Sequence, residues 1–254
     1  AARRSLGEPS AFADTAIVNT TPPPAAYQSS QQSGLPLHFQ DGVPVRLPPT
    51  PSLKFQLALK RAMDIVIALV AIVGLAPVMI LVAAAVKLSS PGPALFGQMR
   101  EGINGTRFCA WKFRSMRIEM GDVTGVQQTQ RGDPRVTPVG RFIRKTSIDE
   151  LPQLFNVLMG QMSIVGPRPH VPDMLAAGIR YDALVPYYAY RLQMAPGITG
   201  WAQANGYRGL TDTAEASKGR VDHDLAYIQN FSILLDLRII VLTAVREFVT
   251  GSGH

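Results

Sequence analysis

Residues 65–86, IVIALVAIVGLAPVMILVAAAV, form an apolar block that stands out from the rest of the chain. These roughly 22 residues carry no charge, and as a helix rising about 1.5 Å per residue they would extend about 33 Å, close to the thickness of a hydrocarbon core. Pro77 lies near the middle of the block, close to Gly74, and removes a backbone hydrogen bond from a helix at that point. A straight membrane-spanning helix and a buried core helix are the alternatives to a helix that bends at Pro77.

Basic residues stand on both sides of this apolar block. They are Lys54, Lys60 and Arg61 before it, and Lys87, Arg100, Arg107 and Lys112 after it. A helix that crosses the membrane once is expected to have its basic residues mainly on one side. The sequence therefore favours a re-entrant helix over residues 53–88 that enters the membrane, breaks at Pro77 and returns to the same face.

Residues 1–52 have a different composition. They include Pro22-Pro23-Pro24, a run of Ser and Gln at residues 29–33, and Pro48-Pro49, without a sustained apolar period. Such a segment cannot bury enough apolar surface to offset the entropy lost on ordering. We therefore expect a disordered tail or linker here, and no secretory signal, because no apolar run of useful length is present.

Residues 89–254 are expected to form a small cytosolic catalytic or binding domain. Asn104-Gly105 is a strong turn signal followed by alternating residues, which predicts a short β-hairpin over residues 94–116. The polar, glycine-containing stretch at residues 119–135 predicts a mobile loop.

Two helical stretches follow in this domain. The first is expected to start within residues 147–150 and to run to about Met159, with Leu151, Leu154, Phe155 and Leu158 on one face. The second, Leu225–Val249, is apolar with few charges, which is typical of an amphipathic helix lying on the bilayer or of a packed core helix. The fold class is therefore α+β and predominantly helical.

The formal net charge of +7 indicates an anionic partner. Phospholipid headgroups and phosphorylated substrates fit this charge, whereas nucleic acid is disfavoured because no binding module is recognised and aromatic residues are sparse. Cys109 is the only cysteine, which excludes an internal disulfide and a Cys-based metal site. Neither a zinc-type His spacing nor a glycine-rich phosphate loop occurs in the sequence.

The string Ser147-Ile148-Asp149-Glu150-Leu151-Pro152 places two adjacent carboxylates at the expected start of a helix. Its structural interpretation is a capping box formed by Ser147 and Glu150. The cap could also lie one or two residues later, because Pro152 fits best within the first turn. Its functional interpretation uses the positive end of the helix dipole, which favours ionised carboxylates. One ionised acid could then attack phosphorus while its neighbour holds Mg²⁺. From the residues alone, both interpretations stay open.

The string Gly166-Pro167-Arg168-Pro169 presents an arginine on a loop that two prolines stiffen. It is either a rigid connector or a preorganised fork for a phosphate or carboxylate.

A group of basic residues elsewhere in the chain either faces lipid headgroups or neutralises a diphosphate. Its members are Lys112, Arg114, Arg135, Arg141, Arg144 and Lys145.

Taken together, these motifs resemble the monotopic bacterial sugar transferases, the polyprenyl-phosphate phosphoglycosyl transferases. The matching strings are KRAMD at residues 60–64, WKFRSM at 111–116, RFIRKTSIDELPQLFNVLMGQMSIVGPRP at 141–169, PGITGWAQANG at 196–206 and HDLAYIQNFSILLDLRIIVLT at 223–243. The resemblance covers about residues 54–250, and WAQANGYRG is most similar to the exopolysaccharide-initiating members that use UDP-hexoses.

The resemblance implies that Asp149 is the nucleophile, which would form a phosphosugar–aspartyl intermediate and release UMP, and that Glu150 binds Mg²⁺. The phosphosugar would then pass to a polyprenyl (undecaprenyl) phosphate. The residues expected to bind substrate are Lys112, Arg114, Arg144, Arg168, Pro169 and Asp224. The resemblance also implies a re-entrant helix broken at Pro77.

The implied partners are a UDP-sugar, polyprenyl phosphate and membrane lipids, at the cytoplasmic face of a bacterial inner membrane; the identity of the hexose and a homo-oligomeric state are left open. The sequence departs from the family pattern at Ala76, where Ser is common, and at Ala195, where a basic residue is common and Arg191 could substitute. A membrane-anchored binding protein without catalysis is the alternative, and it would tolerate changes at both acids.

Overall fold

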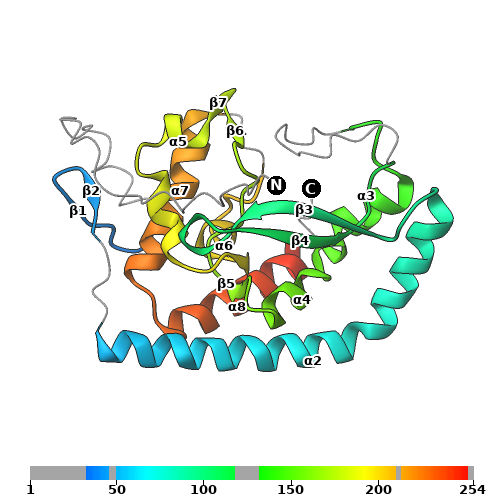
Figure 1. Ribbon diagram of the computed structural model, residues 1–254, viewed down its shortest axis with the longest axis horizontal. Helices are drawn as coiled ribbons and strands as arrows, with labels where there is room; N and C mark the ends of the chain where they lie inside the picture. The colour runs from blue at the N-terminus through cyan, green and yellow to red at the C-terminus, as the bar shows by residue number, and fades with distance from the viewer. Residues whose placement is uncertain (1–32, 46–49, 118–131, 210–212, 251–254) are drawn as a thin grey trace, which may run out of the picture.

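The computed structural model describes residues 33–45, 50–117, 132–209 and 213–250. The helices are α2 (Pro51–Ser89), α3 (Pro138–Lys145), α4 (Gln153–Leu158), α5 (Tyr181–Leu184), α6 (Trp201–Ala204), α7 (Ala214–Gln229) and α8 (Ile233–Thr250), with 3-10 turns η1 (Ile103–Gly105), η3 (Ile148–Glu150) and η4 (Tyr188–Gln193). The strands are β1 (Phe39–Gln40), β2 (Val43–Pro44), β3 (Leu95–Glu101), β4 (Arg107–Phe113), β5 (Ser163–Val165), β6 (Leu175–Ala176), β7 (Ile179–Arg180) and β8 (Gly197–Thr199). The result is the predicted mixed, mainly helical fold, in which the strands form two-stranded pairs (Figure 1).

Helix α2 contains the apolar block and is longer than the predicted 53–88. Thr50 caps its N-terminus by accepting a hydrogen bond from the Leu53 amide, and Pro51 fits the first turn, where its missing N–H costs least. Pro77 lies inside the helix without interrupting it. Figure 1 shows that α2 runs along the base of the molecule and that its last part turns upward.

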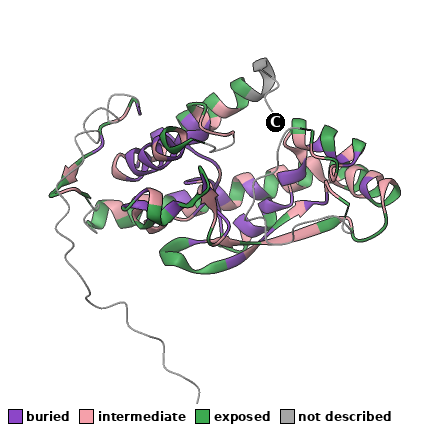
Figure 2. Ribbon diagram, turned by 90° about the horizontal axis from the view of Figure 1, so that it is seen from above, coloured by how far each residue is buried: buried purple, intermediate pink, exposed green. Residues whose placement is uncertain are grey.

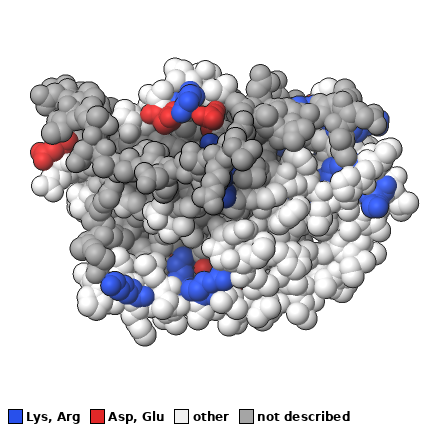
Figure 3. All heavy atoms as spheres, in the orientation of Figure 1, with Lys and Arg blue, Asp and Glu red and all other residues white. Residues whose placement is uncertain are grey.

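Helix α2 is long and apolar enough to cross a membrane by its length and composition, and only 11% of its most apolar window is buried. Its exposed side chains include Val70 and Val73, and the neighbouring helix α8 exposes Leu234 and Val241. Figure 3 shows that the lower right of the molecule, where α2 turns upward, is almost free of charged side chains. These elements form an exposed apolar base.

Polar side chains in the first part of α2 hold it against the domain. The Lys60 ammonium donates to the Asp236 carboxylate of α8 at 2.6 Å and to the Val165 carbonyl of β5 at 2.8 Å. Asp64 accepts from the Ile164 amide at 3.0 Å, and Arg61 donates to the Val157 carbonyl at the end of α4 at 2.5 Å. A buried ion pair and a helix-end contact therefore fix α2 beneath β5 and α4.

Strands β3 and β4 pair in antiparallel register, with Leu95 opposite Phe113 and Glu101 opposite Arg107. Asn104 and Gly105, in the turn between them, both adopt positive φ angles, at 53° and 75°. Asparagine and glycine tolerate this conformation better than other residues, which explains the turn signal in the sequence. The loop predicted at residues 119–135 lies mostly outside the described residues.

The expectation of a structureless segment over residues 1–52 does not hold for residues 33–45. This arm docks on the domain: Leu37 is buried, the Trp201 indole donates to the Ser33 carbonyl at 2.7 Å, and the His38 amide donates to Gln229 of α7 at 2.7 Å. Composition alone missed these contacts because their partners lie more than a hundred residues away in sequence.

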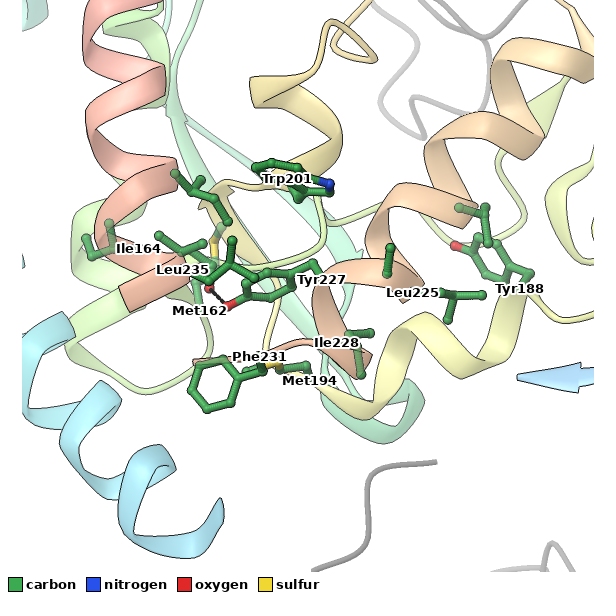
Figure 4. Close-up of a cluster of buried hydrophobic side chains, with 14 of the residues drawn as sticks. Met162, Ile164, Tyr188, Met194, Trp201, Leu225, Tyr227, Ile228, Phe231 and Leu235 are labelled. Atoms are coloured by element: carbon green, nitrogen blue, oxygen red, sulfur yellow. Dashed lines mark hydrogen bonds between the residues drawn. The ribbon is translucent and has the colours of Figure 1, made fainter. Parts of the chain in front are cut away.

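The main core lies between α6, α7, α8 and the strands above α2. Trp201, Leu225, Tyr227 and Leu235 point into it from three helices (Figure 4). Figure 2 shows the same arrangement, with buried segments in the middle of the molecule and exposed ones along its rim. The core holds together the segments that carry the predicted site.

The helix predicted over Leu225–Val249 is in fact two helices. Helix α7 ends at Gln229, where the Asn230 side chain donates back to the Ala226 carbonyl at 2.8 Å. Helix α8 begins at Ile233, and the Ser232 hydroxyl accepts from the Leu235 amide at 3.2 Å. Asparagine and serine prefer such helix-end positions, so the break has a local cause that the apolar pattern obscured.

Candidate active site

The two acids lie on the 3-10 turn η3 rather than in the first turn of a long α-helix. The predicted capping box is wrong: Ser147 adopts a left-handed conformation with φ 57°, and its hydroxyl caps no helix. The hydroxyl instead accepts a hydrogen bond from Arg208 at 2.7 Å. A capping residue needs an extended backbone, which Ser147 does not have. Helix α4 starts only at Gln153.

Turn η3 is seated on the second half of the apolar helix. Ile148 and Leu151, on either side of the acids, pack in a cluster with Met79, Val82 and Val86 of α2. Through this shared cluster, the turn with Asp149 and Glu150 lies near the part of α2 that follows Pro77. If α2 lies in a membrane, the acids are therefore close to its surface.

Glu150 is held by two cations. Its Oε1 accepts from the Lys112 ammonium at 2.8 Å and from the Arg168 guanidinium at 2.6 Å, and its Oε2 accepts from Arg168 at 3.1 Å. Burial opposes ionisation here, but Arg168 and Lys112 outweigh it and hold the pKa of Glu150 well below its usual range. Glu150 is thus a fixed negative charge at neutral pH.

Asp149 differs from its neighbour although both side chains are buried. Its oxygens accept none of the hydrogen bonds that tie Glu150 to Lys112 and Arg168. Burial raises the pKa of Asp149 to about 6, and the nearby Lys112 offsets only part of this effect. The expectation that a helix dipole would favour the ionised form is therefore wrong, because a three-residue turn has little dipole and burial dominates.

The loop that carries Arg168 is fixed through four consecutive backbone carbonyls. The Pro167 carbonyl accepts from the Gly197 amide, Arg168 from the Arg191 guanidinium, Pro169 from Arg100, and His170 from the Glu101 amide; the lengths are 2.9, 2.6, 3.0 and 2.9 Å. The Gly197 and Glu101 amides are backbone donors, and Arg191 and Arg100 are side-chain donors. Because each carbonyl has a separate donor, the backbone of Arg168 is preorganised.

Arg191 reaches this loop from a fully buried ion pair. Its Nε and Nη2 atoms both donate to Asp224 Oδ2, at 3.0 and 2.7 Å, and both side chains are almost inaccessible. Asp224 was expected to bind substrate, but in the structure it lies behind the loop and holds Arg191. Arg191 in turn contacts the loop backbone.

The other predicted substrate-binding residues fall in different places. The positive charge of Arg144, on α3, offsets part of the rise that burial causes in the pKa of Asp149. Pro169 lines the site. Arg114 does not join this group, because its guanidinium donates to the carbonyls of Val86, Ser90 and Pro91 at the end of α2. It therefore anchors the apolar helix to β4.

Three residues of the site were not assigned from the sequence. Arg100 and Gln153 line a cavity of about 10 Å³ together with Lys112, Glu150 and Arg168. Arg208 contacts Ser147 next to the acids. Their sequence signals were weak: Arg100 was counted only among the flanking basic residues, and nothing local distinguishes Arg208 from a solvated arginine.

This fold and site define a class of protein: an enzyme with a carboxylate pair in a cation-rich site, built directly on a long apolar helix and suited to an anionic substrate. The family model described as bacterial sugar transferase matches residues 55–250, and the chain belongs to this family.

Individual relatives agree with the family assignment. The chain is 51% identical over 197 residues to an exopolysaccharide production protein of Rhizobium leguminosarum bv. phaseoli, covering 78% of this chain and 98% of that protein. It is 48% identical over 219 residues to the UDP-glucose:undecaprenyl-phosphate glucose-1-phosphate transferase of Escherichia coli K12, covering 86% of this chain and 46% of that enzyme. An Aeromonas hydrophila UDP-N-acetylgalactosamine-undecaprenyl-phosphate N-acetylgalactosaminephosphotransferase is 42% identical over 85% of this chain and 49% of its own length. The chain thus spans about half the length of these two enzymes.

Proposed function

We propose that this chain transfers a sugar 1-phosphate from a UDP-sugar to a polyprenyl phosphate, through a covalent phosphosugar–aspartyl intermediate. The observation that carries the proposal is the difference between the two acids. Glu150 is locked by Lys112 and Arg168, whereas the oxygens of Asp149 stay outside these ion pairs. The names of the Escherichia coli and Aeromonas relatives support a UDP-sugar donor and an undecaprenyl phosphate acceptor.

In the first step, an ionised Asp149 oxygen attacks the sugar-linked phosphorus and the bond from that phosphorus to the oxygen of UMP breaks. In the second step, a phosphate oxygen of the acceptor attacks the same phosphorus and Asp149 leaves as a carboxylate. Lys112, Arg144 and Arg168 would offset the negative charge of the diphosphate in both steps. No net proton is consumed, provided that Asp149 starts ionised.

Mg²⁺ fits the chemistry of the donors in this proposal. Mg²⁺ uses one or two carboxylates together with phosphate oxygens, and Asp149 and Glu150 are neighbouring buried carboxylates. Glu150 Oε1 accepts from Lys112 and Arg168, and Oε2 accepts from Arg168, so these cations would exchange partners if Glu150 held the ion. The ion would supply charge stabilisation to the diphosphate.

The test of this function is UMP release. The protein, in vesicles that contain undecaprenyl phosphate, is incubated with UDP-glucose, UDP-galactose or their N-acetylated counterparts, with Mg²⁺ or with excess EDTA. We expect UMP release from at least one UDP-hexose with Mg²⁺ and none with EDTA. If no UDP-sugar yields UMP under any of these conditions, the proposal is wrong, and release that persists in EDTA would remove Mg²⁺ from it.

The pKa of Asp149 predicts the pH dependence of the first step. The acid must be ionised to attack, and burial raises its pKa to about 6. We therefore expect kcat/KM for the UDP-sugar to rise as pH increases through about 6 and to level off above about 7. A profile of UMP release from pH 5 to 8 checks this, and a rate that is flat down to pH 5 would contradict it.

We also propose that α2 is re-entrant, at the cytoplasmic face of a bacterial inner membrane. Both ends of the helix are tied to the same domain, through Lys60 and Asp236 near its start and through Arg114 at its end. A helix that spans the membrane would separate these ends by roughly the 30 Å of the hydrocarbon core. A bend at Pro77 allows both contacts.

Cysteine labelling in intact cells checks this topology. We expect Lys54→Cys and Pro93→Cys, each in a Cys109→Ser background, to be protected equally from a membrane-impermeant thiol reagent. Both should react after the membrane is opened. Labelling of only one of the two positions from outside would show that α2 spans the membrane.

A further inference from the structure

Arg100 is a buried cation of the site that the proposed mechanism does not use. It lies on β3, where its guanidinium donates to the Pro169 carbonyl at 3.0 Å and to the Gln98 side chain at 2.5 Å. Its Nε atom is buried and has no hydrogen-bond partner among the residues that the structure describes. A buried donor without a partner is costly, and a water molecule, an ion or a ligand can remove this cost by accepting from it.

The register of the hairpin explains why Arg100 reaches the site. Lys112 of β4 lies opposite Phe96, and Arg100 lies four residues beyond Phe96 on β3. Residues with this even spacing share one face of a sheet, so Arg100 and Lys112 point to the same side. Both line the cavity with Arg168 and Glu150.

The charges around this cavity are not balanced. Arg100, Lys112 and Arg168 carry three positive charges, and Glu150 is the single acid among the lining residues. Burial lowers the pKa of Arg100 only to about 10, so it stays protonated at neutral pH. Charges of one sign that are gathered out of water need a counter-charge, and the Glu150 carboxylate supplies only part of it.

We propose that Arg100 completes an anion subsite with Lys112 and Arg168, which binds a phosphate group of the UDP diphosphate. This inference rests on the proposed function and adds a residue to it. Both terminal nitrogens of Arg100 already donate, to Pro169 and Gln98, so the buried Nε–H and the positive charge are what Arg100 offers to the phosphate.

The side chains of Arg168 and Arg100 differ in their freedom to move. The cavity, at about 10 Å³, has room for about one water molecule, so a phosphate enters only if a lining side chain moves. The Arg168 side chain is 25% exposed and can turn outward, whereas the Pro169 carbonyl and Gln98 fix Arg100. Arg100 is thus the stationary contact of the subsite, and Arg168 the one that moves.

Binding of UDP, measured by calorimetry on the purified protein, tests the subsite without requiring turnover. We expect Arg100→Gln to weaken UDP binding at least about tenfold while uridine binding stays unchanged, because only the phosphates contact Arg100. Arg100→Lys keeps the charge and should lose no more than about threefold. Arg180→Gln removes a charge from an exposed ion pair that does not line the cavity, and it should bind UDP as the wild type does.

Other outcomes overturn the proposal. Wild-type UDP affinity in Arg100→Gln would show that Arg100 contacts no phosphate, and equal loss in Arg100→Lys would assign the effect to the contacts with Pro169 and Gln98. If Arg100→Gln does not fold, NMR of the wild-type protein takes its place as the test. The Nε–H resonance of Arg100 should then shift when UDP is added and not when uridine is added. If UDP binds as expected but no UDP-sugar yields UMP, the proposed function fails while the subsite stands.

Discussion

Asp149→Asn is expected to abolish the phosphosugar–enzyme adduct and to lower UMP release by about four orders of magnitude or more, the scale seen when an enzyme loses its nucleophile. The amide has the shape of the carboxylate but cannot attack phosphorus. Intact mass measured after incubation with the UDP-sugar alone, without acceptor, detects the adduct directly. Asp173→Asn is the matched control, because Asp173 is exposed and forms its ion pair with the equally exposed Arg180.

The same substitution should leave the fold intact. Because burial raises the pKa of Asp149, its ionised form is disfavoured in the folded state, and the unfavourable contribution is present above pH 6 and disappears as pH falls below the unfolded value near 4. Asn removes this contribution, so the Tm at pH 8 should not fall. Full turnover in Asp149→Asn would exclude Asp149 as the nucleophile.

Asp224→Asn is expected to destabilise the fold by about 3–5 kcal/mol, the usual cost of leaving one partner of a buried ion pair without its counter-charge. Arg191 and Asp224 are both almost completely buried, so water cannot replace the lost carboxylate. Urea unfolding in detergent measures the change. Asp182→Asn breaks an exposed ion pair with Arg180 and should change the midpoint little.

A double variant separates stability from positioning. Arg191→Met with Asp224→Leu replaces the pair by apolar side chains and should recover much of the lost stability. It should still release UMP more slowly and with a higher KM for the UDP-sugar, because the Arg168 carbonyl has lost its donor. Activity that returns together with stability would show that the pair has only a structural role.

The local features of the fold were predictable from the sequence. The apolar block predicted the long helix, and Asn104-Gly105 predicted the turn because both residues tolerate positive φ. The motif strings predicted that Asp149, Glu150 and Arg168 belong to one site. Each of these signals depends on residues that are close together in the sequence or that belong to one continuous motif string.

Three of the corrections involve a partner distant in the chain. Ser147 accepts from Arg208 instead of capping a helix, Arg114 turns to the end of α2, and residues 33–45 dock on α7. A capping motif can lie at a helix start or outside a helix, and a polar segment can be disordered or docked on the domain. Local sequence distinguishes these outcomes poorly, so the packing of the whole domain selects between them.

The sequence alone predicts a long apolar helix followed by a small domain with two adjacent acids. The different surroundings of the two acids arise only on folding, when Lys112, 38 residues before Glu150, and Arg168 both come to donate to Glu150. Asp149 is buried beside them, outside these ion pairs. The charge of a buried group depends on its neighbours in space and on the water it has lost. Neither can be read from positions along the chain.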